Sequence, residues 1–142
     1  MGESAPRSGK FFYTQNTGLY RAMKSAFNWS ENFLSEFKAR GFYLDDLSLI
    51  PVNGMSDRER RRQCEASIES LADRLAEYKP AALVILVRRI DKWVRTAVAQ
   101  AGLGIPVYNT TYPGRFQKLR TQFSSDMAVI IPQLFDVRPN AR

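Results

Sequence analysis

Short apolar segments alternate with longer segments of helical periodicity along this chain, and this alternation limits the fold more than any other feature. Three segments are predicted to be strands, because apolar residues cluster between turn-forming residues. They are Phe42–Ile50, Ala82–Val87 and Ile105–Tyr108. Strands separated by long helices pair most readily as a parallel sheet with helices on both faces. The sequence therefore predicts a three-layer α/β/α domain with a short parallel sheet.

The helices are marked by apolar residues at helical spacing and by capping residues. They are predicted over residues 19–27, 30–41, 56–78, 90–101 and from 115 onward. Ser56 followed by Glu59 is a capping box, which predicts the start of one long helix. Ser30 is the expected N-cap of the second helix, and Gly41 its stop. We expect one domain over 1–142, with 138–142 as a frayed tail.

The charge and composition of the chain limit which partners and which kinds of functional site it can have. The net charge of +7 attracts nucleic acid or other polyanions without specifying either, and a solvated helix face also explains the dense basic stretch at 58–62. The chain has no histidine, which excludes His-ligated zinc and an imidazole base. One cysteine, Cys64, excludes an internal disulfide and predicts a reducing cytoplasm. The longest apolar run, Ala81–Val87, is far too short for a membrane span.

The chain opens with Gly2-Glu3-Ser4-Ala5-Pro6, which carries a carboxylate and a hydroxyl between turn-forming residues. Glycine and proline at these positions predict a tight turn. In α/β sheets such a turn follows the carboxyl end of a buried strand, where ligands bind. The alternative is an amino-terminal segment without structure.

This segment and three others resemble motifs of the uracil-DNA glycosylase superfamily. Gly2-Glu3-Ser4-Ala5-Pro6 and the following Gly9-x-x-Phe12 are similar to the first motif of its bacterial and archaeal branch, Gly-Glu-Ala-Pro-Gly followed by Gly-x-Pro-Phe-Val. The resemblance implies that the protein binds DNA, flips a damaged base into a pocket and hydrolyses its N-glycosidic bond without a metal or cofactor. In that fold the strand before the first motif is central. Because the motif starts at Gly2, we expect the central amino-terminal strand to be missing.

The first motif and the first strand carry the residues expected to handle water and base. The resemblance implies that Glu3 and Ser4 position or activate the attacking water, beside Gly2 in the same loop. It implies that Phe12 stacks on the flipped base; the alternative is a hydrophobic core cluster with Phe11 and Tyr13.

The two adjacent acids at the first predicted strand match the position that reads the edge of the base. Asp46 aligns best, and Asp45 is one residue away; the alternative is a pair of solvated acids at a strand end. An ionised aspartate accepts a hydrogen bond from uracil N3–H but cannot donate one to O4. Either Asp46 is protonated, or the base is not uracil.

Tyr112-Pro113-Gly114-Arg115-Phe116 resembles the second glycosylase motif, usually His-Pro-Ser. Tyr112 stands in the place of the histidine, where a phenol can donate a hydrogen bond to the departing base. Gly114, Arg115 and Phe116 are the candidate DNA contacts, as wedge and phosphate ligands. The alternative is a plain Pro-Gly turn.

Two further expectations complete this interpretation. Cys64 falls where one iron–sulfur ligand lies in the thermostable branch, but as the single cysteine it implies no cluster and is expected to be a buried helix residue. Glu3, Phe12, Asp46 and Tyr112 should converge on one cleft at the carboxyl ends of the strands. The rival hypothesis is a catalytically inactive module of the same fold that binds nucleic acid, a nucleotide or a partner protein.

Overall fold

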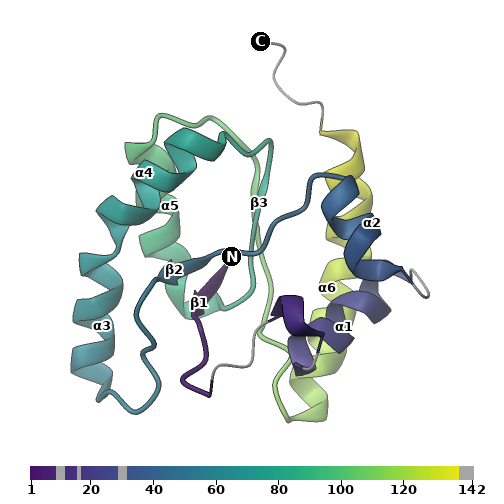
Figure 1. Cartoon of the computed structure of the whole chain (residues 1–142), viewed down its shortest axis with the longest axis horizontal. Coiled ribbons are helices and arrows are strands. Elements are labelled where there is room, and N and C mark those ends of the chain that lie inside the picture. The colour runs from purple at the N-terminus through teal and green to yellow at the C-terminus, as the bar shows by residue number, and fades with distance from the viewer. Residues whose placement is uncertain (9–11, 16, 29–31, 138–142) are drawn as a thin grey trace.

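Short parallel strands run through the middle of the molecule, with helices on either side, in the computed structural model (Figure 1). The structure describes residues 1–8, 12–15, 17–28 and 32–137. The strands are β1 (Gly2–Ser4), β2 (Asp46–Ser48), β3 (Leu83–Ile85) and β4 (Val107–Asn109). The helices are η1 (Phe12–Thr14), α1 (Gly18–Phe27), α2 (Phe33–Ala39), α3 (Asp57–Ala66), α4 (Ile68–Tyr78), η2 (Arg88–Ile90), α5 (Asp91–Gln100) and α6 (Gln117–Asp136), where η denotes a 3-10 helix. The predicted α/β class is confirmed.

The strands form two parallel pairs that the backbone of Met1 links. The register pairs Gly2 with Asp46, Ser4 with Ser48, Leu83 with Val107, and Ile85 with Asn109. The Met1 nitrogen donates to Val84 O at 2.6 Å, and Leu86 N–H donates to Met1 O at 2.9 Å. These two bonds have the slanted pattern of a parallel pair. They place the strands side by side in the order β2, β1, β3, β4.

The prediction of a turn at the start of the chain is wrong for Gly2–Ser4, which is strand β1. The Gly2 N–H donates to Asp45 O at 2.9 Å, and the Met1 backbone bonds to the segment that contains β3. β1 therefore lies between β2 and β3, in the place where we expected a missing strand. Its three residues carry no strand pattern of their own, because their extended conformation is fixed by hydrogen bonds to distant segments.

The predicted first strand, Phe42–Ile50, is reduced to β2. Its end is set by the hydroxyl of Ser48, which accepts from Ile50 N–H at 3.1 Å and donates to Ile50 O at 2.7 Å. This local side-chain bond replaces the ladder of the sheet. The other two strands lie within or next to their predicted segments, and each is also short.

The capping signal at Ser56 located the start of α3 correctly. The Ser56 capping box is present: Ser56 Oγ accepts from Glu59 N–H at 3.2 Å, and Glu59 Oε2 accepts from Ser56 N–H at 2.9 Å. The single long helix predicted after it is wrong, since it is divided at Ser67 into α3 and α4. The Ser67 hydroxyl donates to Gln63 O at 2.6 Å, a bond to the preceding turn that favours bending. Residue 30, the predicted N-cap, and the tail at 138–142 lie outside the described residues.

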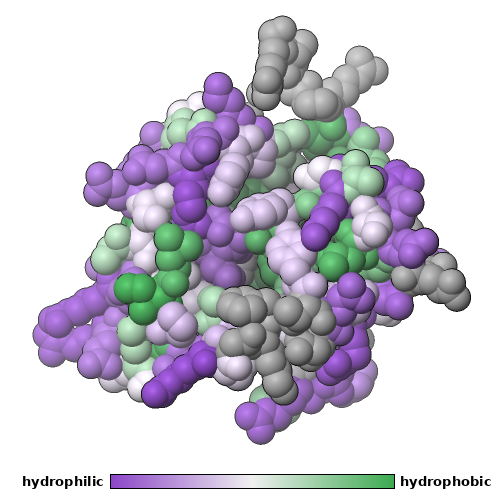
Figure 2. Space-filling view, viewed as in Figure 1, coloured by the Kyte–Doolittle hydropathy of each residue, from purple (hydrophilic) through white to green (hydrophobic). Residues whose placement is uncertain are grey.

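Two hydrophobic cores fill the spaces on either side of the strands. Helices α3, α4 and α5 lie together on one side, and α1, α2 and α6 on the other (Figure 1). The first core is mainly aliphatic, and its largest fully buried members include Leu47, Leu71, Ile85, Ile90 and Val94. The second is rich in aromatic rings, among them Phe12, Tyr20, Phe27, Phe33, Phe37 and Phe123. Figure 2, in the same view as Figure 1, shows hydrophobic areas of the surface between hydrophilic side chains. Leu49 and Ile50, which follow β2, are exposed hydrophobic residues.

Candidate functional site

A cavity of about 580 Å³ lies against β1 and the segments that leave β3 and β4. We call it the carboxyl-end cavity, because β3 and β4 end beside it. Its lining includes Gly2, Glu3, Ser4, Phe12, Tyr13, Asp46, Arg60, Arg88, Arg89 and Tyr112. The four residues expected to converge, Glu3, Phe12, Asp46 and Tyr112, are therefore brought together. In parallel α/β sheets this edge is where ligands bind.

Glu3 is held by two arginines from different helices. Its side chain is 8% exposed, and Oε1 accepts from Arg60 Nη2 at 2.6 Å while Oε2 accepts from Arg60 Nε at 3.3 Å. Arg89 Nε donates to Oε2 at 3.1 Å, and Arg89 Nη2 donates to Oε1. Burial favours the neutral acid, but the hydrogen bonds and charges of both arginines outweigh it and hold the pKa of Glu3 below its usual value. These bonds occupy the lone pairs of both carboxylate oxygens, which argues against Glu3 as the base that activates water.

Ser4 ends β1 and ties it to the turn after β2. Its Oγ accepts a hydrogen bond from Val52 N–H at 3.2 Å. The side chain is half-buried and lines the carboxyl-end cavity. A hydroxyl that accepts from the backbone keeps its own proton for donation, so Ser4 is able to orient a water molecule or a ligand oxygen in the cavity.

Asp46 and Gly2 are register partners whose atoms approach closely. A Cβ atom on Gly2 would lie 2.3 Å from Asp46 Oδ1, so a larger residue at position 2 would displace this carboxyl group. Burial raises the pKa of Asp46, with the positive amino terminus opposing this and the charge of Asp45 adding to it. No hydrogen bond from another described residue reaches the Asp46 carboxyl oxygens. Asp46 is therefore a poorly solvated acid that faces the cavity and is available to a ligand.

Tyr112 follows β4 and is 43% exposed. Burial of the hydroxyl, reinforced by the negative charge of Asp46, raises the pKa of Tyr112. The phenol is therefore protonated at neutral pH and is a hydrogen-bond donor. Among the described residues, none accepts a hydrogen bond from this hydroxyl.

Phe12 belongs to the aromatic core and also lines the cavity. It is 5% exposed, and its ring centroid lies 5.3 Å from that of Tyr13, 5.4 Å from Phe37 and 5.8 Å from Tyr20. Tyr13 is fixed as well, because its hydroxyl accepts from Leu44 N–H at 2.8 Å. The alternative of a core cluster is thus what the structure shows for Phe12, whereas Phe11 lies outside the described residues. The two rings of η1 supply a rigid apolar wall.

Asp45 does not join the site. Arg74 Nη1 donates to Asp45 Oδ2, and the Asp46 N–H donates to Asp45 Oδ1 at 2.8 Å. Asp45 lines a different cavity, at the amino ends of the strands. Adjacent residues of an extended segment point to opposite sides, which separates the two aspartates. The prediction that Asp45 takes part in substrate binding is therefore not supported by its position.

The three predicted DNA contacts lie beside the cavity rather than in it. Gly114 and Arg115 line a neighbouring hollow of about 880 Å³, which meets the carboxyl-end cavity at Tyr112. Phe116 is 66% exposed at the start of α6. Arg120 Nη1 donates to Gly114 O at 3.0 Å and to Arg115 O at 2.6 Å, so this arginine holds the loop.

Sequence reasoning missed the arginines that hold Glu3. Arg60 lies in the basic stretch that a solvated helix face explained, and Arg89 was not singled out. They lie 57 and 86 residues from Glu3, so no local pattern connects them. Cys64, as expected, is a buried helix residue, and burial together with the charge of Glu3 raises the pKa of its thiol to about 11.

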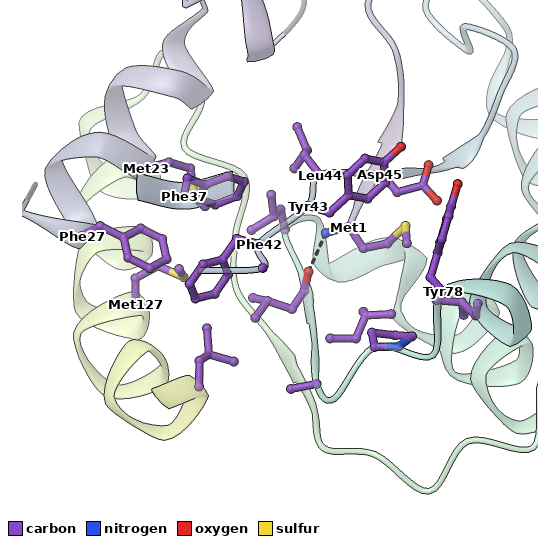
Figure 3. Close-up of a pocket in the computed structure, with 18 residues that line it drawn as sticks. Met1, Met23, Phe27, Phe37, Phe42, Tyr43, Leu44, Asp45, Tyr78 and Met127 are labelled. Carbon is purple, nitrogen blue, oxygen red and sulfur yellow. Dashed lines mark hydrogen bonds between the residues drawn. The ribbon is translucent and has the colours of Figure 1, made fainter. Parts of the chain in front are cut away.

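A second cavity, of about 380 Å³, lies at the amino ends of the strands (Figure 3). We call it the amino-end cavity. Methionine and phenylalanine side chains make up much of its wall, with the Met1 nitrogen bonded to Val84 O across it. Tyr43 and Tyr78 lie beside Asp45 at one edge, with ring centroids 5.5 Å apart. This cavity is predominantly apolar.

Within the described ranges, no helix combines the length and apolar character that crossing a membrane requires. The same part of the chain holds no cluster of three or more Cys, Asp or Glu side chains suited to a metal ion. No protein-family model, no curated protein and no solved structure matches the chain.

Proposed function

We propose that this protein is a uracil-DNA glycosylase-like base-excision enzyme with a three-layer α/β/α fold. One observation carries the proposal: Glu3, Ser4, Phe12, Asp46 and Tyr112, singled out by resemblance from four separate segments, all line one cavity. Its position at the carboxyl ends of β3 and β4 is where ligands bind in parallel α/β sheets.

The dimensions and walls of the carboxyl-end cavity suit a flipped nucleobase. Small-molecule pockets in proteins typically span roughly 300–1,000 Å³, and this cavity of about 580 Å³ falls within that range. Phe12 and Tyr13 provide the apolar wall against which a base packs. Asp46 provides the polar group for the edge of the base, and burial, by raising its pKa, widens the pH range in which its protonated form can donate to a carbonyl oxygen.

The proposed reaction is hydrolysis of the N-glycosidic bond. The bond between C1′ and the base nitrogen breaks, and its electron pair leaves with the base. Water forms the new bond to C1′, and the proton that it loses passes through solvent to the departed base anion. Ser4 orients this water, and the neutral phenol of Tyr112 donates a hydrogen bond to the departing base, whose negative charge grows as the bond breaks. Glu3 supports the cavity through its arginines and takes no proton.

A second candidate function is base or nucleotide binding without catalysis. The observation in its favour is that both oxygens of Glu3 are occupied by Arg60 and Arg89, so that the one ionised carboxylate of the first motif cannot act on water. Ser4, a weak base, then remains as the water ligand. This module would bind the base edge through Asp46 and release the nucleic acid unchanged.

Incubation with defined oligonucleotides separates the two candidates. Single- and double-stranded DNA carrying uracil, hypoxanthine or xanthine is treated with the protein and then with alkali, which cleaves abasic sites. We expect strand cleavage at one or more of these bases, and none in undamaged DNA. Binding of damaged DNA without cleavage would establish the non-catalytic module, and neither binding nor cleavage would refute both.

A further inference from the structure

We propose that Arg60 and Arg89 form a phosphate-binding pair at the wall of the carboxyl-end cavity, held in position by Glu3. The ligand is a phosphate oxyanion attached to the nucleotide whose base enters the cavity. In that respect the proposal deepens the proposed function and rests on it. The phosphate belongs either to a DNA backbone or to a free mononucleotide.

The geometry of the two guanidinium groups leaves donors available. Each arginine approaches Glu3 from the side, through Nε and Nη2, so that two of its three nitrogens serve the carboxylate. The Nη1 group of each arginine makes no hydrogen bond to another described residue. A planar guanidinium fixed by a bidentate bond presents its remaining N–H groups in a defined direction, which suits the oxygens of a phosphate.

The charge balance favours an anion at this place. One carboxylate faces two guanidinium groups, so the cluster keeps one positive charge in excess. Glu3 is buried, whereas the side chains of Arg60 and Arg89 are 27% and 51% exposed. The excess charge is therefore presented at the surface of the cavity. The nearby Arg88 adds no free charge, because it pairs with Asp126 at 3.0 Å.

A purely structural ion pair explains the cluster less well. Glu3 in β1 would be neutralised by Arg60 of α3 alone, with both carboxylate oxygens bonded. The second arginine adds a half-exposed ion pair, and pairs of that kind contribute little to stability. Recognition of an anion accounts for the second guanidinium group. Two arginines held by the same carboxylate together offer their remaining N–H groups to one oxyanion.

The first experiment measures the affinity of the whole protein for a fluorescent single-stranded oligonucleotide by anisotropy. Arg89→Gln is expected to weaken binding about tenfold, the effect of one lost charge-assisted hydrogen bond. Arg89→Lys keeps the charge but loses the planar guanidinium group with its paired N–H donors, so we expect an intermediate loss of affinity. Arg61→Gln removes an exposed arginine of α3 that does not line the cavity and should change the affinity less than twofold. Equal losses in Arg89→Gln and Arg61→Gln would overturn the proposal.

Neutral phosphate analogues show whether the contact is to phosphate. Single phosphates of the oligonucleotide are replaced in turn by methylphosphonates. At one position we expect the replacement to weaken binding by the wild type about tenfold and to leave the affinity of the Arg89→Gln variant unchanged. If the methylphosphonate and Arg89→Gln instead weaken binding additively at every position, the assignment is contradicted. Two changes that remove the same hydrogen bond cannot each cost its full energy.

Mononucleotides separate the two sources of phosphate and the two proposals. Deoxyuridine 5′-monophosphate and deoxyuridine are titrated calorimetrically into the wild type, Arg89→Gln and Arg60→Gln. If the wild type binds the monophosphate more tightly than the nucleoside, and both variants abolish this difference, the phosphate is that of a free nucleotide. If the substitutions weaken binding of the oligonucleotide alone, the phosphate is that of the DNA backbone. If the wild type excises no base but Arg89→Gln still weakens phosphate binding, the proposed function fails and the phosphate pair stands. If no phosphate probe distinguishes the wild type from Arg89→Gln, the pair is refuted whatever the excision result.

Discussion

The two cavities lie at opposite ends of the same strands and differ in what their polar groups do. The amino-end cavity is lined mainly by apolar side chains, and its carboxylate, Asp45, is already bonded to Arg74 and to the Asp46 N–H (Figure 3). At the carboxyl-end cavity, neither the Asp46 carboxyl group nor the Tyr112 hydroxyl is hydrogen-bonded to another described residue. Two adjacent aspartates thus have opposite roles, one structural and one available to a ligand.

A charged residue in a cavity is informative about function only after its bonding partners are known. Asp45 and Asp46 are adjacent aspartates of which Asp46 aligns better with the base-reading position, and Glu3 is the carboxylate of the segment that resembles the first glycosylase motif. The structure shows Asp45 and Glu3 fully paired and Asp46 unpaired within the described residues. Burial raises the pKa of Asp46, while two arginines hold the pKa of Glu3 down. The acid with unused bonding capacity is the better candidate for chemistry.

We expect the greatest loss of stability from a substitution in the amino-end cavity. Met127 is 1% exposed and lines this cavity, so Met127→Ala should lower the free energy of unfolding by about 3 kcal/mol through lost packing. Urea denaturation measures this loss. At a temperature where the variant is folded, its affinity for DNA should equal that of the wild type. Weaker DNA binding by the folded variant would show that the amino-end cavity takes part in recognition.

The next effect concerns the arginine cluster at the other cavity. Glu3→Gln leaves two guanidinium groups without their anion and should cost about 2 kcal/mol of stability, because the arginines are partly exposed and retain some hydration. The pKa of Glu3 is lower in the folded than in the unfolded protein, so its stabilising contribution is present at neutral pH and is lost as the pH falls through the folded pKa. The difference between wild type and Glu3→Gln should therefore shrink in acid. A difference independent of pH would mean that the carboxylate charge is unimportant.

The smallest effect on stability concerns Asp46. Its pKa is raised in the folded state, so the wild type loses stability as the pH rises through that folded pKa. Asp46→Asn removes this penalty and should raise the free energy of unfolding by about 1 kcal/mol near neutral pH. The two proteins should converge at low pH, where the wild-type acid is neutral. Denaturation curves at several pH values test this, and a less stable Asp46→Asn protein at neutral pH would mean that attraction to the amino terminus and Arg74 outweighs the burial of the carboxylate.

Features set by neighbouring residues were predictable from the sequence. The Ser56 capping box requires only Glu59 three residues later, and both hydrogen bonds are present. The amphipathic pattern of α1 gave its extent within one residue, because a helix closes its own backbone bonds. The division at Ser67 was missed because the apolar stripe that marked the helix lies within α4, and the sequence between Ser56 and that stripe contains no glycine or proline.

Features set by distant residues were not predictable in the same way. β1 is a strand because β2 and the Val84–Leu86 backbone bond to it, and nothing within Gly2–Ser4 announces those partners. Likewise, the role of Glu3 depends on Arg60 and Arg89, which only the folded chain brings near. Resemblance to a family located the residues of the cavity. It did not specify which acid would be neutralised by its neighbours.

Excision rate against pH for the wild type, Asp46→Asn and Asp46→Ala tests most directly whether the carboxyl-end cavity reads a base through Asp46. We expect the wild-type rate on uracil to fall as Asp46 ionises, since the charged carboxylate cannot donate to O4. Asp46→Asn should keep or exceed the wild-type rate at every pH, because an amide both donates and accepts. Asp46→Ala should lose base selectivity, at about 1–3 kcal/mol for each lost hydrogen bond. An Asp46→Ala protein as active and as selective as the wild type would contradict the assignment of the cavity.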